Sequence, residues 1–401
     1  MRVSHFALLL ASSLPLPGVL GWGAAGHEIV ATIAQIHLDP SVFLSMCTVL
    51  NFTSHNPNEP QCHLAPIAAW ADKMRYKMRW SSSLHYVGAL DDYPSQTCEF
   101  PGERGWAGRK NINVLGGVRN VTNLLEDWVD NEARTAARDD VANEALKFLV
   151  HFMGDLHMPL HLTGRDRGGN SNKVRFGGRL TNLHSLWDGL LIAKAIRETP
   201  RKYSRPLPYP QIEFALRDTI YDSYVRRIMW EGVLNKWADE IPDWVSCPTK
   251  SDTSPSDSLW QQVMTTWNRV TRRGGVADDT DDELLCPYHW ATPIHGLNCE
   301  IVWPKELDEP PYHHAAAPQA PIYDSLPPHG CGEHEFEIAD GPGPYLDLDT
   351  PEYAGVIADR LIVEKLLAQA GIRLAAIINW LFADIDGEGS RYHKLKVLEL
   401  K

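Results

Sequence analysis

The sequence predicts a mainly α-helical chain that folds as a single domain. Apolar residues recur at helical spacing in most of the long segments, few stretches alternate as strands do, and no internal repeat is visible. The chain has 401 residues, of which 44% are hydrophobic, so it can bury a large core. These observations place it among the multi-helix globular proteins.

The first 21 residues are typical of a secretory signal peptide. Arg2 supplies the positive end, residues 6–16 form the apolar run, and Gly21 ends a plausible cleavage site. Cleavage there would make Trp22 the first residue of the mature chain. We therefore expect a mature domain over 22–401 that is secreted or vacuolar, with no later apolar run long enough to span a bilayer.

Cysteines and glycosylation sequons fit an oxidising compartment. Seven cysteines are scattered without a C-x-x-C pair, which indicates disulfides rather than a thiolate metal site, and the odd count leaves one over. Cys47 and Cys62 flank a polar loop between two helical patterns, so a local bridge is expected there. Asn51 and Asn120 begin acceptor sequons.

The helical patterns follow one another along most of the chain. Their apolar residues repeat at the α-helical period, and the expected helices cover residues 22–38, 41–50, 63–80, 113–128, 137–153, 212–238 and 353–382. Residues 84–87 are short and are predicted to be extended. Four prolines between 200 and 210 mark a break in the helical pattern.

Residues from about 248 to 350 differ in composition from the rest. They contain a Ser/Asp/Pro stretch, an acidic run and a Pro- and His-rich region, which predicts a long irregular surface insertion before the C-terminal helix. A solvated loop explains its histidines better than metal binding does; these are His313, His314, His329 and His334.

The net charge of −13 restricts the possible ligands. It excludes an extended basic groove along duplex nucleic acid, which would need clustered lysines and arginines. It does not exclude a phosphate substrate, because bound metal ions would supply positive charge locally.

The stretch 151–188 holds the strongest chemical signal. His151 and Asp155 are four residues apart, as are His184 and Asp188, and helical spacing places each pair on one face. His161, just past Pro159, adds a further imidazole. Imidazole and carboxylate without thiolate is the ligand set of hydrolytic zinc. One such pair is usually a surface ion pair, but two pairs and an extra histidine favour metal sites.

Four groups upstream extend this set. They are the free α-amino group that cleavage would create on Trp22, and the side chains of His27, Asp72 and His85. Taken alone, each is more often structural. His157 lies off the face of the first pair, so packing or supporting hydrogen bonds are expected for it.

These residues stand in motifs that resemble one family. W-G-x-x-G-H, W-A-D-x-x-R, S-x-L-H-Y-V, H-F-x-G-D-x-H-x-P-L-H, G-G-N and N-L-H-x-x-W-D occur in this order. The chain is similar in them to the fungal and plant single-strand-specific zinc nucleases, or 3′-nucleotidases, which share a helical fold with bacterial zinc phospholipase C. The resemblance spans residues 22 to about 244 and resumes over 353–384.

The resemblance implies three zinc ions. The first would be held by Asp72, His85, His151 and Asp155. The second would be held by the amine and carbonyl of Trp22, by His27 and by Asp155, which bridges the pair. The third would be held by His161, His184 and Asp188.

The resemblance also implies a reaction. A hydroxide shared by the close zinc pair attacks phosphorus, the third zinc neutralises the departing 3′-oxygen, and the products carry a 5′-phosphate. Asp155 is catalytic as the bridge, and Arg75 matches a family arginine that binds the scissile phosphate. The expected substrates are single-stranded DNA and RNA and 3′-nucleotides, and a monomer is expected.

The sequence motifs indicate the substrate-binding residues less specifically than they indicate the metal ligands. Tyr86 matches a position for base stacking, although a core aromatic fits as well. Asn170 matches a substrate-pocket position, although a turn-forming asparagine after two glycines explains it equally. Gly88 departs from the Asp or Asn of other members, which predicts weak base discrimination.

Two alternative functions remain. A zinc phospholipase C-like phosphodiesterase would keep the metals, but the chain lacks an amphipathic basic surface helix. A non-catalytic protein with structural zinc would need closed sites, whereas the third site has three protein ligands and one open position.

Overall fold

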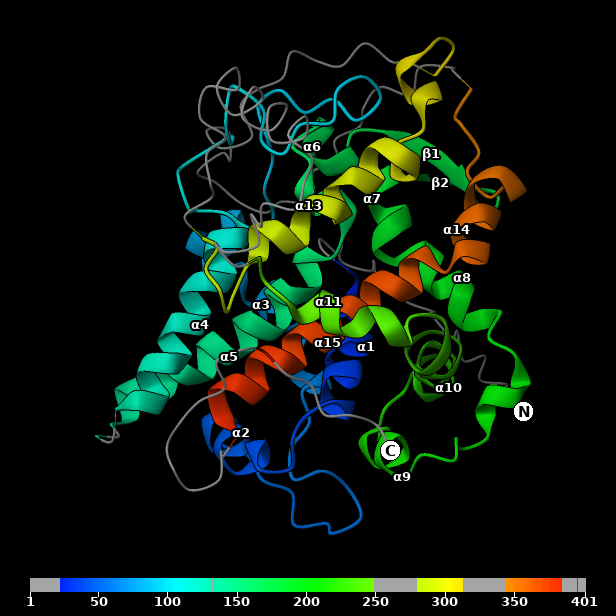
Figure 1. The fold of residues 1–401 in the computed structure, drawn as a ribbon. Helices are drawn as coiled ribbons and strands as arrows, with labels where there is room; N and C mark the ends of the chain where they lie inside the picture. The colour runs from blue at the N-terminus through cyan, green and yellow to red at the C-terminus, as the bar shows by residue number, and fades with distance from the viewer. Residues whose placement is uncertain are drawn as a thin grey trace, which may run out of the picture.

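The computed structural model describes residues 22–131, 133, 135–248, 280–312, 344–383 and 395. Helices dominate this part of the chain (Figure 1), and its one sheet is the antiparallel pair β1 (Lys173–Phe176) and β2 (Arg179–Asn182). The predicted mainly α class is confirmed. The expected signal peptide lies outside the described residues.

The helices and short helical turns have the following bounds. In chain order they are α1 (Ala24–Ile36), α2 (Val42–Leu50), η1 (Ala65–Ile67), α3 (Trp70–Met74), η2 (Arg79–His85), α4 (Val114–Asp130), α5 (Ala136–Leu156), η3 (Pro159–Leu162), α6 (Asp166–Gly169), α7 (Leu183–Ser185), η4 (Leu186–Leu190), α8 (Leu191–Arg197), η5 (Arg201–Ser204), α9 (Pro210–Ala215), α10 (Asp222–Arg227), η6 (Ile228–Lys236), η7 (Ala238–Glu240), α11 (Ile241–Val245), α13 (Pro287–Leu297), η8 (Asn298–Val302), η9 (Lys305–Asp308), η10 (Pro351–Gly355), α14 (Val356–Arg360) and α15 (Ile362–Phe382).

Three helices, α1, α5 and α15, form the centre of the molecule, and α4 lies along α5 (Figure 1). Nearly every residue of α15 is buried, and α5 is buried without interruption from Phe148 to Leu156. Gly371 lets α15 approach α1 closely, since a Cβ at this position would lie 2.7 Å from the Cβ of Ile33. The C-terminal half of α5 is therefore buried in the interior of the molecule.

Local sequence signals begin the two longest helices of the first half. The side chain of Asn113 accepts a hydrogen bond from Gly116 N at 3.0 Å, and that of Thr135 accepts one from Arg138 N at 3.3 Å. Both are N-caps, which satisfy backbone donors that a helix leaves free in its first turn. The predicted helices over 22–38, 41–50, 113–128 and 137–153 are confirmed.

Three other predicted helices are broken. Residues 63–80 form η1, α3 and the start of η2 instead of one helix, and residues 212–238 are divided among α9, α10, η6 and η7. The pattern over 353–382 is interrupted at Leu361, whose φ of 57° is left-handed. Residues 84–87 are extended only from Tyr86 onward, because η2 runs on to His85.

The prediction of a surface insertion with little core is wrong for residues 280–312. Trp290, Ile294 and Val302 are buried in the main core. Two disulfides, Cys98–Cys299 and Cys247–Cys286, attach this segment to the rest of the molecule. Apolar residues at helical spacing in α13 are the physical reason, since their burial outweighs the polar character of the surrounding sequence.

Of the remaining cysteine and histidine predictions, one is confirmed and the others concern residues that the structure does not describe. The expected Cys47–Cys62 bridge is confirmed. Cys331 and the four histidines of the Pro- and His-rich region lie outside the described residues.

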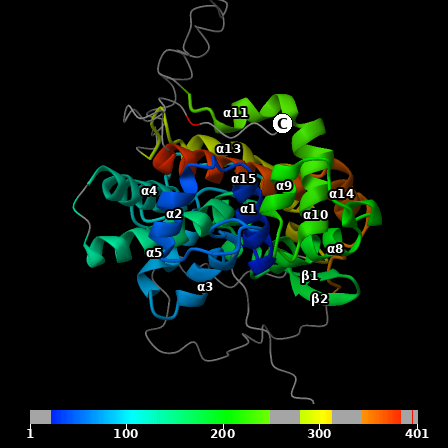
Figure 2. The ribbon, with the colours of Figure 1, turned by 90° about the horizontal axis from the view of Figure 1, so that it is seen from below.

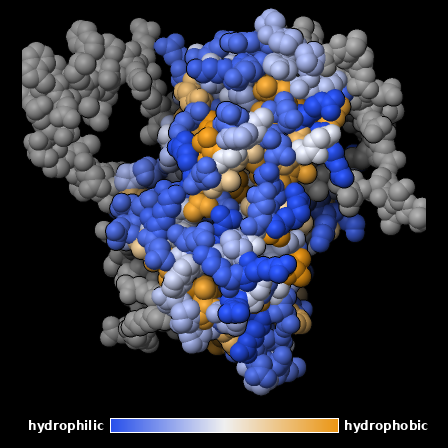
Figure 3. All heavy atoms as spheres, turned by 90° about the vertical axis from the view of Figure 1, so that its right-hand side faces the viewer, coloured by the Kyte–Doolittle hydropathy of each residue, from blue (hydrophilic) through white to orange (hydrophobic). Residues whose placement is uncertain are grey.

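The surface of the described part is largely polar. The face in Figure 3 is mostly hydrophilic, with small scattered hydrophobic patches. Among the described helices, none combines the length and the apolar character needed to cross a membrane. Both sequon asparagines, Asn51 and Asn120, are exposed.

Candidate metal centre

Asp155 lies at the centre of the predicted ligands. It is completely buried on α5, and its two oxygens face different partners. Oδ2 lies 2.9 Å from His85 Nδ1 and 3.3 Å from His151 Nε2. Oδ1 lies 3.5 Å from His27 Nε2 and 3.4 Å from His161 Nδ1. One carboxylate thus joins histidines from four separate segments of the chain.

The eight predicted side-chain ligands form three groups that could each hold a metal ion. Within each group the potential ligand atoms lie within 4.8 Å of one another; the groups are Asp72, His85 and His151, then His27, His151 and Asp155, and finally His161, His184 and Asp188. The first two groups share His151, and the imidazoles of His27 and His151 stack at 3.9 Å. His151 and Asp155, and likewise His184 and Asp188, which are four positions apart in the sequence, therefore lie close together in the structure.

Backbone carbonyls orient three of the imidazoles. His151 Nδ1 donates to Ala68 O at 2.8 Å, His161 Nδ1 to His85 O at 2.7 Å, and His184 Nδ1 to Gly168 O at 2.7 Å. A carbonyl only accepts hydrogen bonds, so the proton must be on Nδ1 and the Nε2 lone pair is left for a ligand. Such supporting bonds are typical of metal-binding histidines.

Several buried polar atoms of this set make no hydrogen bond within the described part of the chain. They are both ring nitrogens of His27, Asp72 Oδ1, His85 Nε2, His151 Nε2, Asp155 Oδ1 and His184 Nε2. A buried polar atom without a partner costs about 1–3 kcal/mol. Cations at the three groups would satisfy these atoms, and nitrogen and carboxylate donors without thiolate suit zinc. The residues therefore fit the metal that the sequence predicts.

Charge and burial act against each other in this centre. Burial, reinforced by His151, lowers the pKa of His27 to about 4, and burial with the neighbouring His161 lowers that of His184 to about 3. For His151, burial also lowers the pKa, but Asp155 and Asp72 outweigh it and raise the value to about 9. Without metal ions, a proton on His151 would compensate the buried carboxylates.

Two glycines shape the centre, although neither was predicted to be a site residue. A Cβ on Gly154 would lie 2.4 Å from His27 Nδ1, and one on Gly168 would lie 2.5 Å from Leu160 O. Gly168 is also left-handed, with φ at 66°. A glycine inside a long helix costs about 1 kcal/mol relative to alanine, so Gly154 in H-F-M-G-D was the available signal for a close neighbour.

His157 is not among the groups. Its Nδ1 donates to Met153 O at 2.7 Å, and its Nε2 accepts from Arg373 at 2.8 Å. Arg373 also donates to Trp244 O at 2.7 Å. His157 therefore links the end of α5 to α15, as expected for a packing or supporting residue.

Trp22 lies beside the centre. Its side chain is fully buried, and the next residue, Gly23, donates its N–H to Asp188 O at 2.8 Å. Gly26 makes room for Trp22, since a Cβ there would lie 2.8 Å from Trp22 Cβ. The start of the expected mature chain is thus held next to the third group.

The predicted substrate residues lie around the groups. Arg75 follows the last turn of α3, so it is within one turn of Asp72. Tyr86 comes directly after His85 and is partly buried; burial raises its pKa, and the nearby Arg167 opposes this effect.

Two further positions concern substrate contacts. Asn170 Nδ2 donates to Arg167 O at 2.8 Å, which is the turn-forming role. Gly88 packs against Gly164, and a Cβ would lie 2.6 Å from its backbone.

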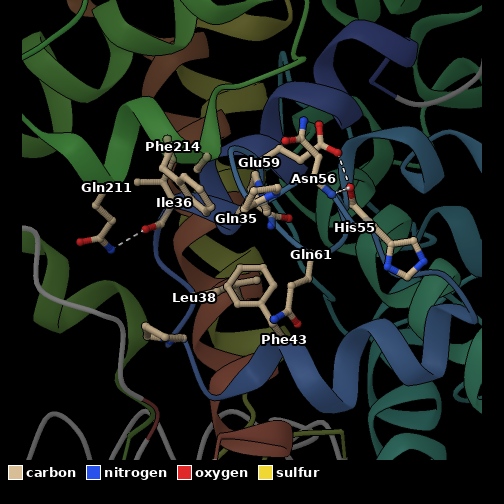
Figure 4. Close-up of a pocket in the computed structure, with 15 residues that line it drawn as sticks. Gln35, Ile36, Leu38, Phe43, His55, Asn56, Glu59, Gln61, Gln211 and Phe214 are labelled. Carbon is tan, nitrogen blue, oxygen red and sulfur yellow. Dashed lines mark hydrogen bonds between the residues drawn. The ribbon is translucent and has the colours of Figure 1, made fainter.

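A separate pocket lies away from these groups (Figure 4). It has a volume of about 580 Å³ and is lined by residues of α1, α2, α9 and the loop that the Cys47–Cys62 bridge closes. Gln211 donates to Ile36 O on its wall at 2.9 Å. Ile36 ends α1 nine residues after His27, about 14 Å along the helix. The pocket contains no residue of the three groups.

Comparison with known proteins agrees with this geometry. Residues 22–308 match the family model of the S1/P1 nucleases. The chain is 30% identical to Endonuclease 2 of Arabidopsis thaliana over 59% of its own length and 72% of that protein. It is 35% identical to Nuclease P1 of Penicillium citrinum over 44% and 60%, and 34% identical to Nuclease S1 of Aspergillus oryzae over 42% and 53%. The sequence motifs, the helical fold and the three His/Asp groups lead to one conclusion: the chain is a hydrolase that belongs to the S1/P1 nuclease family.

Proposed function

We propose that this chain is a secreted, zinc-dependent endonuclease that hydrolyses single-stranded DNA and RNA to 5′-phosphate products and removes 3′-phosphates from nucleotides. The observation that carries the proposal is the position of Asp155, whose two oxygens face two neighbouring groups of imidazoles. A carboxylate in this position can serve two metal ions at once.

Three zinc ions fit the donors. Asp72, His85, His151 and Asp155 would hold the first, Trp22, His27 and Asp155 the second, and His161, His184 and Asp188 the third. The third set is one of the groups of close donors described above, and the 3.3 Å between Asp155 Oδ2 and His151 Nε2 supports adding Asp155 to the first. Bound zinc supplies Lewis-acid chemistry, which acidifies water and neutralises negative charge on phosphate oxygens. The Trp22 amine exists only after cleavage following Gly21, so one extra residue left in front of Trp22 should lower the zinc content of the purified protein.

The side chains around the groups position the substrate. Arg75, three residues after Asp72 in the chain, presents a guanidinium that can bind two oxygens of the scissile phosphate. Tyr86 follows His85 and offers a ring on which a base can stack. Gly88 has no room for a side chain, because Gly164 packs against it, which supports weak base discrimination. We further propose that the domain covers 22–401 and acts as a monomer.

Asp155→Asn tests the proposal. The change keeps the shape of the side chain but removes its charge, so we expect the protein to fold, to lose zinc measured by mass spectrometry, and to lose activity on single-stranded DNA. Asp92→Asn is a matched control, because Asp92 is also buried and lies 2.9 Å from His295 Nε2. It should retain zinc and activity.

Substrate comparison separates the proposal from its alternatives. The wild-type enzyme should digest single-stranded DNA and RNA faster than duplex DNA, and a chelator should stop it. Faster hydrolysis of phosphatidylcholine than of single-stranded DNA would favour a phospholipase. Fewer than two zinc ions per chain would contradict the proposed mechanism.

A further inference from the structure

Residues 73–80 have an unusual composition for this acidic protein. The sequence K-M-R-Y-K-M-R-W places four cations and two aromatic residues within eight positions, although the whole chain carries a net charge of −13. The segment starts directly after Asp72, and η2 continues from it to His85. Both flanking residues belong to the first metal group. Figure 2 shows α3, where the segment begins, next to α5.

Five of the eight residues of this segment are exposed, namely Lys73, Tyr76, Lys77, Arg79 and Trp80. Tyr76 exposes 59% of its surface and Trp80 exposes 62%, whereas most large aromatic residues of the described core are buried. Lys77 and Arg79 are exposed as well, and neither forms a salt bridge within the described residues. Other arginines are paired, such as Arg226 with Glu213 at 2.8 Å. The positive charges of Lys77 and Arg79 are therefore available to a partner.

Packing beneath the segment holds its exposed ring in place. The Trp80 ring contacts Phe148 at a centroid distance of 5.5 Å, and Phe148 stacks on Phe152 at 5.1 Å. Phe152 in turn meets His85 edge-on at 5.3 Å. A row of rings thus connects the exposed Trp80 with a predicted zinc ligand. An indole fixed from below loses little rotamer freedom when a base stacks on its other side.

We propose that Lys77, Arg79 and Trp80, the outer part of residues 73–80, form a docking track for the single strand outside the catalytic centre, in which Lys77 and Arg79 contact phosphates and Trp80 stacks on a base. This inference rests on the proposed function and adds a binding surface to it. Cations alternating with exposed aromatic rings are the pattern by which proteins bind unpaired nucleic acid without sequence preference. Bases in a duplex are already stacked, so an exposed indole favours single strands.

The track should favour long substrates. A 3′-mononucleotide carries no neighbouring phosphate to reach Lys77 and Arg79, whereas an oligonucleotide does. Removal of the two charges should therefore weaken oligonucleotide binding and leave the turnover of a 3′-mononucleotide unchanged.

The test compares the double variant Lys77→Gln/Arg79→Gln with the control Arg201→Gln/Arg205→Gln. The control removes two exposed arginines around η5, far along the chain, so both variants change the net charge equally. The probe is a fluorescent phosphorothioate oligothymidine of about 30 nucleotides, longer than one binding site. Its binding is followed by anisotropy over a series of salt concentrations, and KM and kcat are measured with a 3′-mononucleotide.

We expect the Lys77/Arg79 variant to bind the probe about tenfold more weakly than the control, with a salt slope reduced by about 0.7 for each lost cation. Trp80→Ala should weaken binding by a similar factor without changing the salt slope. Equal affinity and equal slope for the Lys77/Arg79 variant and the control would overturn the track. Wild-type protein that binds the probe but cleaves no unmodified strand would contradict the proposed function instead, and the binding series would still decide the track.

Discussion

Gly154 leaves the space that the His27 ring occupies, and this contact defines a test at the scale of one residue. A methyl group at Gly154 would approach His27 Nδ1 to 2.4 Å, so Gly154→Ala must displace the ring or α5. We expect at least a tenfold loss of kcat/KM, since small misplacements of catalytic groups have large effects, and a lower zinc content. Gly296→Ala is the control, because nothing lies within 4 Å of its Cβ position. A Gly154 variant as active as this control would contradict the role.

His37 makes stability depend on pH. Burial lowers its pKa to about 4, although its hydrogen bond to Ile33 O at 2.9 Å opposes the shift. Above the unfolded value of about 6.5 both states are neutral, and as the pH falls toward 4 only the unfolded state gains the proton. The free energy of unfolding should therefore fall by up to about 3 kcal/mol between these two pH values because of His37 alone. Urea midpoints of His37→Gln should fall less over that range than those of wild type; parallel curves would exclude the effect.

The members of the three candidate metal groups could be predicted from the sequence to different degrees. The pairs His151/Asp155 and His184/Asp188 follow from helical spacing alone. His27 and His85 depend on the family resemblance, because each stands by itself in the sequence. The carbonyls that orient the imidazoles could not be predicted, since no side chain encodes them. For Asn170, the structure shows its turn-forming hydrogen bond.

At the scale of elements, the disulfides differ in how many residues separate their two cysteines along the chain. Cys98–Cys299 closes a separation of 201 residues and Cys47–Cys62 one of 15. In the chain-entropy account, the longer loop restricts the unfolded chain more, by about 2 kcal/mol. Replacing Cys98 and Cys299 by serine should therefore lower the free energy of unfolding more than the same change at Cys47 and Cys62. Denaturant titration of both variants measures the difference, and a larger loss for the short loop would contradict it.

Element boundaries were the part of the fold that the sequence predicted least well. Residues 63–80 keep a helical apolar period although the backbone breaks between η1, α3 and η2. Its buried residues Leu64, Ala68 and Ala71 recur three or four positions apart, so the period survives the breaks. The breaks nevertheless matter for the site, because they allow Asp72 and His85 to reach the same metal group.

At the scale of the whole molecule, metal ions should stabilise the fold. The three groups bury carboxylates and imidazoles, and within the described residues ring nitrogens of His27, His85, His151 and His184 have no hydrogen-bond partner. A ligand that binds only the folded state raises stability in proportion to the logarithm of its concentration. We expect the melting temperature of chelator-treated protein to rise as zinc is added. Magnesium is the control, since it prefers oxygen ligands and should have little effect. Equal shifts with both ions would contradict zinc sites.

The overall class was predictable, but the extent of the core was not. Helical periodicity and the scarcity of strand patterns predicted the mainly α fold. Residues 280–312 were assigned to the surface because polar and proline-rich sequence surrounds them, yet Trp290 is completely buried. Two of the contacts that hold this segment are disulfides, whose pairing cannot be deduced from cysteine positions alone.

The packing of α15 on α1 and α5 has a consequence for the order of synthesis. His27, His151 and Asp155 lie on helices whose apolar faces are covered by Ile362–Phe382, close to the end of the chain. A ribosome releases this helix after nearly all other elements, so the early helices lack their cover until translation is almost complete. The three groups that could hold metal ions can therefore form only once translation of the chain is nearly complete.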